Sequence, residues 1–293
     1  MGLFDTGEPM RAKGGTALYV GPAGWSYPDW KGTVYPKPQP KGFRPPTYIA
    51  QFFNVIELNN TFYRPPRADY CARWARDVAA SPGFLYTAKL WDRFTHEREP
   101  HWSARDVGVF RDGLAPLVEA GRLGALLVQF PYSFHPTPPN MDYLAELVEA
   151  FGDLSPVLEV RGRDWLADEP LAKIESLAVG FCNIDQPKFR GNLPLTSHAF
   201  GPTGYVRLHG RNAKAWFDKE SGRDERYDYL YNDKELDELQ SVIEDVAAQV
   251  ERMFVIANNH YRGQAVATGI QLMNRLTGQY VEPPGIISEL YGV

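Results

Sequence analysis

Short apolar runs alternate with longer amphipathic stretches along most of the chain. The apolar runs have the length of buried strands, and the stretches between them repeat apolar residues every three or four positions, as helices do. The predicted strands lie at residues 17–21, 55–58, 84–90, 124–130, 156–160, 178–184, 204–210 and 252–259. The predicted helices lie at residues 47–53, 68–80, 103–121, 140–151, 168–176 and 264–277, with one more behind a capping-box pattern at 232–235.

This order of elements predicts one fold class. Eight strands that alternate with helices indicate parallel βαβ units, and a single-domain (β/α)8 TIM barrel accommodates them all. A doubly wound open sheet is the alternative, because a sequence does not show whether a sheet closes. Residues 1–16 hold glycine and charged residues without an apolar segment, so they are expected to form a flexible N-terminal tail before a barrel domain at residues 17–293.

Nearly every predicted strand gains a hydrogen-bonding side chain near its C-terminal end, where TIM barrels carry their active sites. Side chains alternate along a strand, so Glu57 shares a face with Asn59, and Arg207 with His209. Burying so many polar groups costs free energy unless they pair with one another or with a ligand. The pattern therefore predicts a polar pocket, with an internal network of ion pairs and amides as the alternative.

The predicted site residues are the polar and aromatic residues near these strand ends. Carboxylates suit a general base and a histidine suits a proton shuttle, so the predicted catalytic residues are Glu57, Glu159, Asp185 and His209. His96 is a further shuttle candidate, although its charged neighbours favour a solvated turn equally. Arginine and lysine suit phosphate or carboxylate groups. The predicted ligand-binding residues are Trp25, Tyr27, Asn59, Tyr63, Arg64, Lys89, Gln129, Arg161, Arg207, Asn258 and Asn259.

Composition and charge narrow the class of partner. The 293-residue chain has a formal net charge of -5 at pH 7, which gives no overall attraction toward nucleic acid or an anionic membrane. Its two cysteines lie in no metal-binding spacing. No apolar run approaches the roughly 20 residues that a membrane span needs. We therefore expect a cytoplasmic protein without a membrane partner, in an oligomeric state that the sequence leaves open.

Six segments, in this order, resemble the YecE-like proteins, a family labelled domain of unknown function seventy-two. They are GPAGWSYPDWKGTVYP (21–36), VIELNNTFYRPP (55–66), AKLWDRFTH (88–96), GALLVQFPYSF (124–134), YVRLHGRN (205–212) and NNHYRGQAVA (258–267). The resemblance covers nearly the whole chain and implies a TIM barrel, whereas the activity of the family is unsettled. Two positions depart from the family pattern: Asn60 stands where serine is common, and Gly162 stands where a histidine often follows the arginine.

Several functions are compatible with these residues. The first is an enzyme of the hydrolase, isomerase or lyase type that acts on a small anionic or polyol ligand without a cofactor. A divalent metal held by Glu159, Asp185 and His209 is an alternative by fold analogy, although Asn258 stands where such barrels often have a carboxylate. Nucleic-acid binding or phosphodiester cleavage, as in a distant relative of endonuclease IV, is another alternative. Non-catalytic binding of a small molecule is the last.

Overall fold

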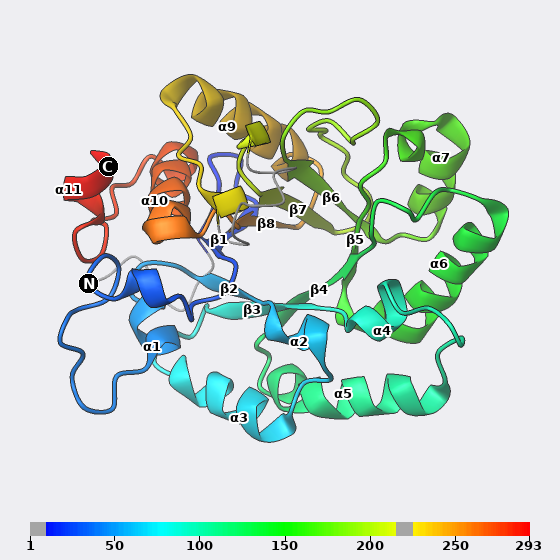
Figure 1. Cartoon of the computed structure of the whole chain (residues 1–293), viewed down its shortest axis with the longest axis horizontal. Coiled ribbons are helices and arrows are strands. Elements are labelled where there is room, and N and C mark those ends of the chain that lie inside the picture. The colour runs from blue at the N-terminus through cyan, green and yellow to red at the C-terminus, as the bar shows by residue number, and fades with distance from the viewer. Residues whose placement is uncertain (1–9, 215–224) are drawn as a thin grey trace.

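The computed structural model describes residues 10–214 and 225–293, and eight parallel strands in this part of the chain form one barrel (Figure 1). The strand order is β1-β8-β7-β6-β5-β4-β3-β2, so neighbours in sequence are neighbours in space, as in a TIM barrel. The predicted fold is thus confirmed. The strands are β1 (Ala17–Pro22), β2 (Val55–Leu58), β3 (Leu85–Lys89), β4 (Leu123–Gln129), β5 (Pro156–Glu159), β6 (Gly180–Asp185), β7 (Thr203–Leu208) and β8 (Arg252–Ala257).

Helices surround the barrel and cover the outer face of its strands (Figure 1). The long ones carry one apolar face, which packs on the sheet. Short helices without a readable period follow β2 and β3 and were not predicted, because one turn is too short to show a repeat. The helices are α1 (Pro45–Ile49), α2 (Asn60–Tyr63), α3 (Ala68–Asp77), α4 (Asp92–Thr95), α5 (Ala104–Glu119), α6 (Pro138–Phe151), α7 (Asp168–Ser176), α9 (Asp233–Ala247), α10 (Gln264–Thr277) and α11 (Ile287–Tyr291).

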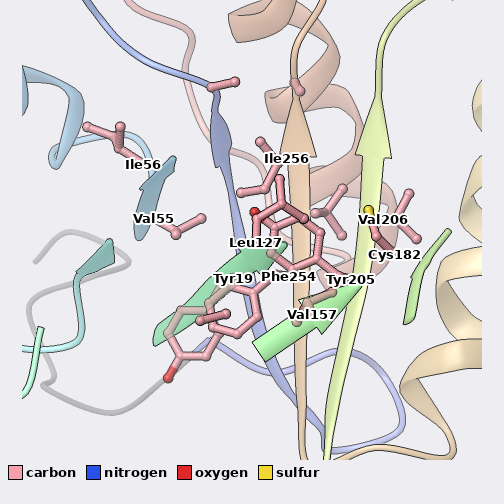
Figure 2. Close-up of a cluster of buried hydrophobic side chains, with 14 of the residues drawn as sticks. Tyr19, Val55, Ile56, Leu127, Val157, Cys182, Tyr205, Val206, Phe254 and Ile256 are labelled. Atoms are coloured by element: carbon pink, nitrogen blue, oxygen red, sulfur yellow. The ribbon is translucent and has the colours of Figure 1, made fainter. Parts of the chain in front are cut away.

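The aromatic rings of Tyr19, Tyr205 and Phe254 pack together inside the barrel (Figure 2). The ring of Phe254 stacks on Tyr19 with centroids 4.8 Å apart and on Tyr205 at 5.9 Å. Gly124 on β4 makes room for this layer, since a Cβ there would lie 2.8 Å from the Phe254 ring. The barrel is therefore a packed core at this level, and the cavity lies at its C-terminal end.

A polar layer lies directly above the aromatic one. Tyr205, Arg207 and His209 share a face of β7 and the residues that follow it, and they carry a phenol, a guanidinium and an imidazole toward the mouth. The hydroxyl of Tyr205 contacts Glu57 Oε2 at 2.8 Å and Thr87 Oγ1 at 3.0 Å. From Tyr205 through Arg207 to His209, the inward-facing side chains thus become more polar toward the C-terminal end of the strand.

Side-chain and close backbone contacts close the barrel between β1 and β2. The amide of Asn54 accepts a hydrogen bond from Val20 N (2.9 Å) and donates one to Leu18 O (2.8 Å). Further along, Gly24 N donates to Glu57 O at 2.9 Å. A Cβ on Gly21 would lie 1.8 Å from the carbonyl oxygen of Val55, so the two backbones approach closely only because residue 21 is a glycine.

The described part of the predicted N-terminal tail contacts the barrel. Ala12 is buried, Leu18 N donates to Met10 O at 2.7 Å, and Lys13 N donates to Leu276 O at 3.3 Å. Residues 1–9 lie outside the described residues, so the domain boundary at residue 17 stays a prediction. No helix within the described ranges is long and apolar enough to cross a membrane.

Candidate functional site

A cavity of about 700 Å³ opens at the C-terminal ends of the strands. Its walls come from segments that follow β1, β2, β3, β4, β5, β7 and β8, which are far apart in the chain. This is the end at which TIM barrels carry their active sites. The lining residues are Gly24, Trp25, Ser26, Tyr27, Pro28, Asn59, Asn60, Phe62, Tyr63, Lys89, His96, Gln129, Arg161, Arg207, His209, Arg226, Tyr227, Asn258 and His260.

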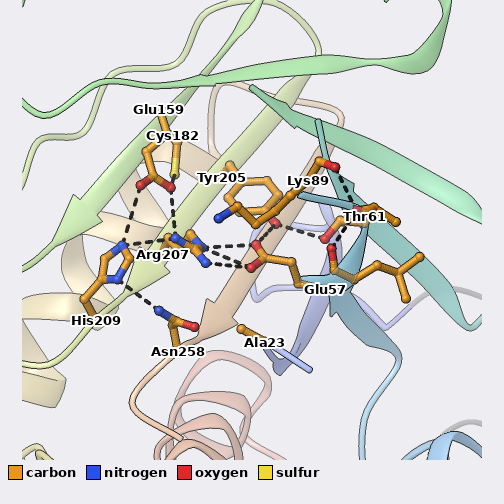
Figure 3. Close-up of polar contacts among 12 residues, drawn as sticks. Ala23, Glu57, Thr61, Lys89, Glu159, Cys182, Tyr205, Arg207, His209 and Asn258 are labelled. Carbon is orange, nitrogen blue, oxygen red and sulfur yellow. Dashed lines mark hydrogen bonds and ion pairs between the residues drawn. The ribbon is translucent and has the colours of Figure 1, made fainter. Parts of the chain in front are cut away.

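The floor of the cavity is a buried ion-pair network centred on Arg207 (Figure 3). Its Nη2 atom donates to Glu57 Oε1 at 2.8 Å and its Nε atom to Oε2 at 3.1 Å, while Nη1 donates to Glu159 Oε2 at 3.3 Å. Both carboxylates are fully buried, and the Arg207 side chain is only 3% exposed. Charges this deep are stable only when they are paired and hydrogen-bonded, and here both conditions hold.

A second arginine completes the charge balance of the floor. Arg161 forms an ion pair with Glu159 Oε1, and its Nη1 atom donates to Gln186 Oε1 at 2.9 Å. Burial by itself would raise the pKa of Glu159, but Arg161 and Arg207 outweigh this effect and hold that pKa well below its usual range. Glu159 is therefore ionised at neutral pH. The two arginines and the two carboxylates compensate one another, which leaves Lys89 as an additional basic group beside them.

His209 is a neutral member of the same floor. Its Nδ1 atom is hydrogen-bonded to the Asn258 amide at 3.0 Å, and its Nε2 atom lies 3.3 Å from Arg207 Nη1 and 3.7 Å from Glu159 Oε1. Burial, followed by the charges of Arg161 and Arg207, lowers the pKa of His209 to about 3. At neutral pH the imidazole is thus an uncharged hydrogen-bonding group and, because of its low pKa, a weak base.

Lys89 ends β3 and reaches the cavity beside the network (Figure 3). The side chain is 9% exposed, and its amine lies 4.1 Å from the centre of the Phe62 ring. Burial lowers the pKa of Lys89 to about 7, and the positive charge of Arg207 acts in the same direction against the opposite effects of Glu57 and Glu159. A large fraction of this amine is therefore uncharged at neutral pH, unlike that of an ordinary lysine.

Aromatic rings form one wall of the cavity. Tyr27 stacks on His260 with ring centroids 4.1 Å apart and an interplanar angle of 9°. Tyr227, from the short helix η4 (Glu225–Tyr227), lies against the same His260 ring at 4.9 Å. Trp25 packs edge-on against Trp74 at 5.5 Å, which holds its indole at the cavity side. Such a wall suits the flat or apolar face of a ligand.

Most of the predicted site residues meet at the cavity. Glu57 and Glu159 lie beneath its lining and are engaged with the arginines, so their carboxylates support the floor. Those that line it are Trp25, Tyr27, Asn59, Tyr63, Lys89, Gln129, Arg161, Arg207, His209 and Asn258. The structure therefore places an ion-pair network and a cavity at the same strand ends, and the catalytic and ligand-binding roles of these residues stay predictions.

Asp185, Asn259 and Arg64 lie elsewhere, contrary to expectation. Asp185 is on the outer face of β6, paired with Arg211 at 2.7 Å, because the inner face of that strand carries residues such as Cys182, whose Sγ atom lies 3.8 Å from Glu159 Oε2. Asn259 follows Asn258 and so points the opposite way, toward the backbone of loop residue 229 and the side chain of residue 268. Arg64 is exposed and does not line the cavity.

Several lining residues come from positions that the strand pattern does not cover. His260 lies beyond the end of β8, and Arg226 and Tyr227 belong to the long connection after β7. The signal for His260 is its place within the segment 258–267, which carries the family resemblance. His96 lines the cavity after α4, so its surroundings are more than a solvated turn. Its pKa is lowered by partial burial and then by the charge of Lys89.

Whether the described residues form a metal-binding site depends on where their possible ligands lie. Among residues 10–214 and 225–293, no group of three or more histidine, cysteine, aspartate or glutamate side chains is placed to hold a metal ion. The predicted set of Glu159, Asp185 and His209 does not converge, since Asp185 lies on the other face of the sheet. These residues therefore do not fit a shared metal ion.

Comparison with known proteins identifies relatives that match most of this chain. The family model described as protein of unknown function DUF72 matches residues 19–287. The UPF0759 protein YunF of Bacillus subtilis (strain 168) is 28% identical over 278 residues, which are 90% of this chain and 96% of YunF. The crystal structure of a DUF72 family protein from Thermotoga maritima MSB8 is similar at 30% identity and a TM-score of 0.76, over 88% of this chain and 98% of that one. A second, from Enterococcus faecalis V583, has a TM-score of 0.78 at 22% identity, over 90% of this chain and 97% of that one.

Proposed function

Because the chain belongs to the DUF72 family, whose description names no activity, we propose a function from the cavity itself: the barrel binds a small anionic ligand that carries hydroxyl groups, and acts on it as an enzyme. The YecE-like resemblance and the solved relatives support the fold on which this site is built. The residues of the site support the ligand class.

The charge of the cavity lining carries the proposal. Its described residues include four basic side chains, Lys89, Arg161, Arg207 and Arg226, and no carboxylate. Arg161 and Arg207 are compensated by Glu159 and Glu57 beneath the lining, so the excess positive charge that faces the cavity comes from Arg226 and from the protonated fraction of Lys89, although the whole chain has a net charge of -5. Guanidinium groups bind phosphate and carboxylate through charge-assisted hydrogen bonds, which are stronger than neutral ones.

The remaining lining residues suit hydroxyl groups and a ring face. Asn59, Gln129 and Asn258 offer amides that both donate and accept hydrogen bonds, as hydroxyl groups require. The rings of Trp25 and Tyr27 offer a surface for the less polar face of a sugar-like ligand. A volume of about 700 Å³ lies within the range of small-molecule sites in proteins.

The proton-transfer groups favour chemistry that begins with removal or addition of a proton. The cavity offers two neutral imidazoles, His96 and His209, and the amine of Lys89, while Glu57 and Glu159 are engaged in ion pairs. Isomerase and lyase reactions use such groups beside a carbonyl or hydroxyl carbon. Hydrolysis, non-catalytic binding and nucleic-acid binding are the alternatives that experiment has to distinguish.

Anion binding is the direct test. Thermal melting with inorganic phosphate, glucose 6-phosphate and citrate, each against chloride of equal ionic strength, is compared with melting in glucose. We expect at least one anion to raise the melting temperature, and glucose alone to raise it less. The basic side chains of the cavity attract an anion, whereas a neutral sugar has no charge for them to attract. If none of the anions stabilises the protein more than chloride does, the proposed ligand class is wrong.

A pair of arginine variants locates the effect. Arg226→Gln removes a cavity guanidinium that makes no ion pair with another described residue, so it is not expected to unfold the protein. Arg64→Gln removes an exposed guanidinium outside the cavity and is the matched control. Loss of one charge-assisted hydrogen bond should weaken the calorimetric affinity for the stabilising anion about tenfold in Arg226→Gln. Equal affinities in the two variants would place the anion elsewhere.

A further inference from the structure

The Lys89 amine differs from the other charged groups of the floor because it has no polar partner among the described residues. Glu57, Glu159, Arg161 and Arg207 are all engaged with one another. The Nζ atom of Lys89, by contrast, forms no hydrogen bond or ion pair with any residue in the ranges 10–214 and 225–293, and its near neighbour is the Phe62 ring. The Phe62 ring beside the amine favours its charged form, but a nearly buried ammonium without an ion pair is costly, and burial is the larger effect.

The charged side chains around Lys89 act on its pKa in both directions. Arg207 from β7 is the nearest strong positive influence, and Arg161 after β5 adds to it. The negative charges of Glu57 and Glu159 act in the opposite direction, but both are already compensated by the arginines. Burial is the largest effect, and together these influences lower the pKa of Lys89 to about 7.

We propose that Lys89 is the nucleophile of this site and that it captures the carbonyl group of an anionic aldehyde or ketone as an imine. This inference rests on the proposed function, because the arginines of the cavity supply the recognition of the anionic group. It narrows the ligand to a carbonyl compound, and the reaction to the isomerase or lyase type.

The covalent step is balanced by water and one proton. The lone pair of Nζ attacks the carbonyl carbon and forms the C–N bond, while the C=O π electrons move to oxygen and an N–H proton is transferred to that oxygen. The carbinolamine then takes one proton from solvent, breaks its C–O bond and releases water, leaving a protonated imine on Lys89. This cation withdraws electrons from the adjacent carbon, which makes loss of a proton or cleavage of a C–C bond there easier.

The site also offers groups for the step that follows. His96 lines the same cavity, and partial burial followed by the charge of Lys89 lowers the pKa of its imidazole, so the ring is an uncharged hydrogen-bonding group there. Gln129 ends the adjacent strand β4 and lines the cavity as well, with an amide that can hold a hydroxyl or carbonyl oxygen. Neither residue is needed for imine formation itself.

Reductive trapping tests the proposal in the wild-type protein. The chain is treated with glyoxylate, a small anionic aldehyde, and sodium cyanoborohydride near pH 7, and the modified lysines are identified by peptide mass spectrometry as a function of time. We expect Lys89 to be labelled at least about tenfold faster than Lys173 on α7, because burial lowers the pKa of Lys89 to about 7 and leaves part of its amine uncharged and nucleophilic at this pH. Labelling of Lys89 no faster than Lys173 would overturn the proposal, without any variant having to fold.

Variants and an uncharged aldehyde separate this proposal from the one it rests on. Lys89→Arg should lose the fast-labelled peptide and Lys173→Arg should keep it; persistence of the fast site in Lys89→Arg would contradict the assignment. Acetaldehyde carries no charge, so it tests the amine independently of anion recognition. Fast labelling of Lys89 by acetaldehyde, with no preference for glyoxylate, would support the reactive lysine and contradict the anionic ligand class. If both aldehydes label Lys89 slowly while the protein still binds anions, the lysine proposal is wrong and the proposed anion binding stands.

Discussion

At the scale of single residues, Arg207 is the group on which the interior of the barrel depends. It lies between Glu57 and Glu159, which come from β2 and β5, and all three are buried. A buried ion pair stabilises a protein little compared with an apolar replacement of the whole set, but removing one partner alone leaves an uncompensated charge. The main effect of Arg207 on stability is therefore that it prevents the buried carboxylates of Glu57 and Glu159 from being left without a positive charge.

Replacement of this arginine should destabilise the protein strongly. In Arg207→Met the side chain keeps much of its length, while Glu57 loses its ion-pair partner and Glu159 keeps only Arg161. We expect the free energy of unfolding, measured by guanidinium denaturation near pH 7, to fall by about 3–5 kcal/mol, as for other broken buried pairs. Arg226→Met is the control and should change it by less than about 0.5 kcal/mol. A loss below about 1 kcal/mol in Arg207→Met would contradict the role of the network.

At the scale of elements, the contact between β1 and β2 is where the barrel closes. The other strand neighbours form parallel ladders, whereas these two are joined by the Asn54 side chain, an isolated bridge from Ala23 to Glu57 and a close backbone approach at Gly21. Glu57, which binds Arg207, belongs to β2, so the position of this strand also sets the geometry of the cavity floor.

A methyl group at this closure should disturb both the fold and the site. In Gly21→Ala the new Cβ would lie 1.8 Å from Val55 O, a distance that forces one strand to move. We expect a loss of at least about 2 kcal/mol in the free energy of unfolding, as for other overpacked interiors.

The matched control is Gly108→Ala in α5. A Cβ at that position meets no atom within 4 Å, and alanine favours a helix interior over glycine by up to about 1 kcal/mol. Both variants are measured by the same denaturation curve. Similar curves for the two would show that β1 and β2 can separate without cost.

At the scale of the whole molecule, the sign of the charge differs between the surface and the site. The chain has a net charge of -5, yet the described lining of the cavity is basic. A polyanion meets the whole surface, whereas a small anion that has entered the cavity meets mainly the lining. The size of the anion thus decides which of the two charges it experiences.

DNA should therefore bind weakly or not at all. We expect neither single-stranded nor duplex oligonucleotides to be retarded in a gel-shift assay at low salt, because the acidic chain provides no extended basic surface by its overall charge. Inorganic phosphate in a parallel thermal melt serves as the positive control for the cavity. Retardation that weakens steeply with added salt would instead favour the nucleic-acid alternative.

Most of the fold and much of the site were predictable because they depend on local periodicity. The strand at residues 55–58 and the helices at 168–176 and 264–277 have the predicted bounds, since apolar repeats are set by neighbouring residues. The rule that residues two apart share a face correctly grouped Arg207 with His209. It could not say which face turns inward on β6, where Asp185 faces outward and Cys182 inward.

By itself, the sequence determined the order of the strands and helices, the fold class, and the clustering of polar side chains at the C-terminal strand ends. All of these depend on short-range patterns that the chain carries in any conformation. Only the tertiary structure decided which polar groups are paired, because Glu57 and Arg207 are 150 positions apart and meet across the barrel. For the same reason, only the packing of distant strands revealed that Lys89 is buried beside charged groups without a polar partner of its own among the described residues.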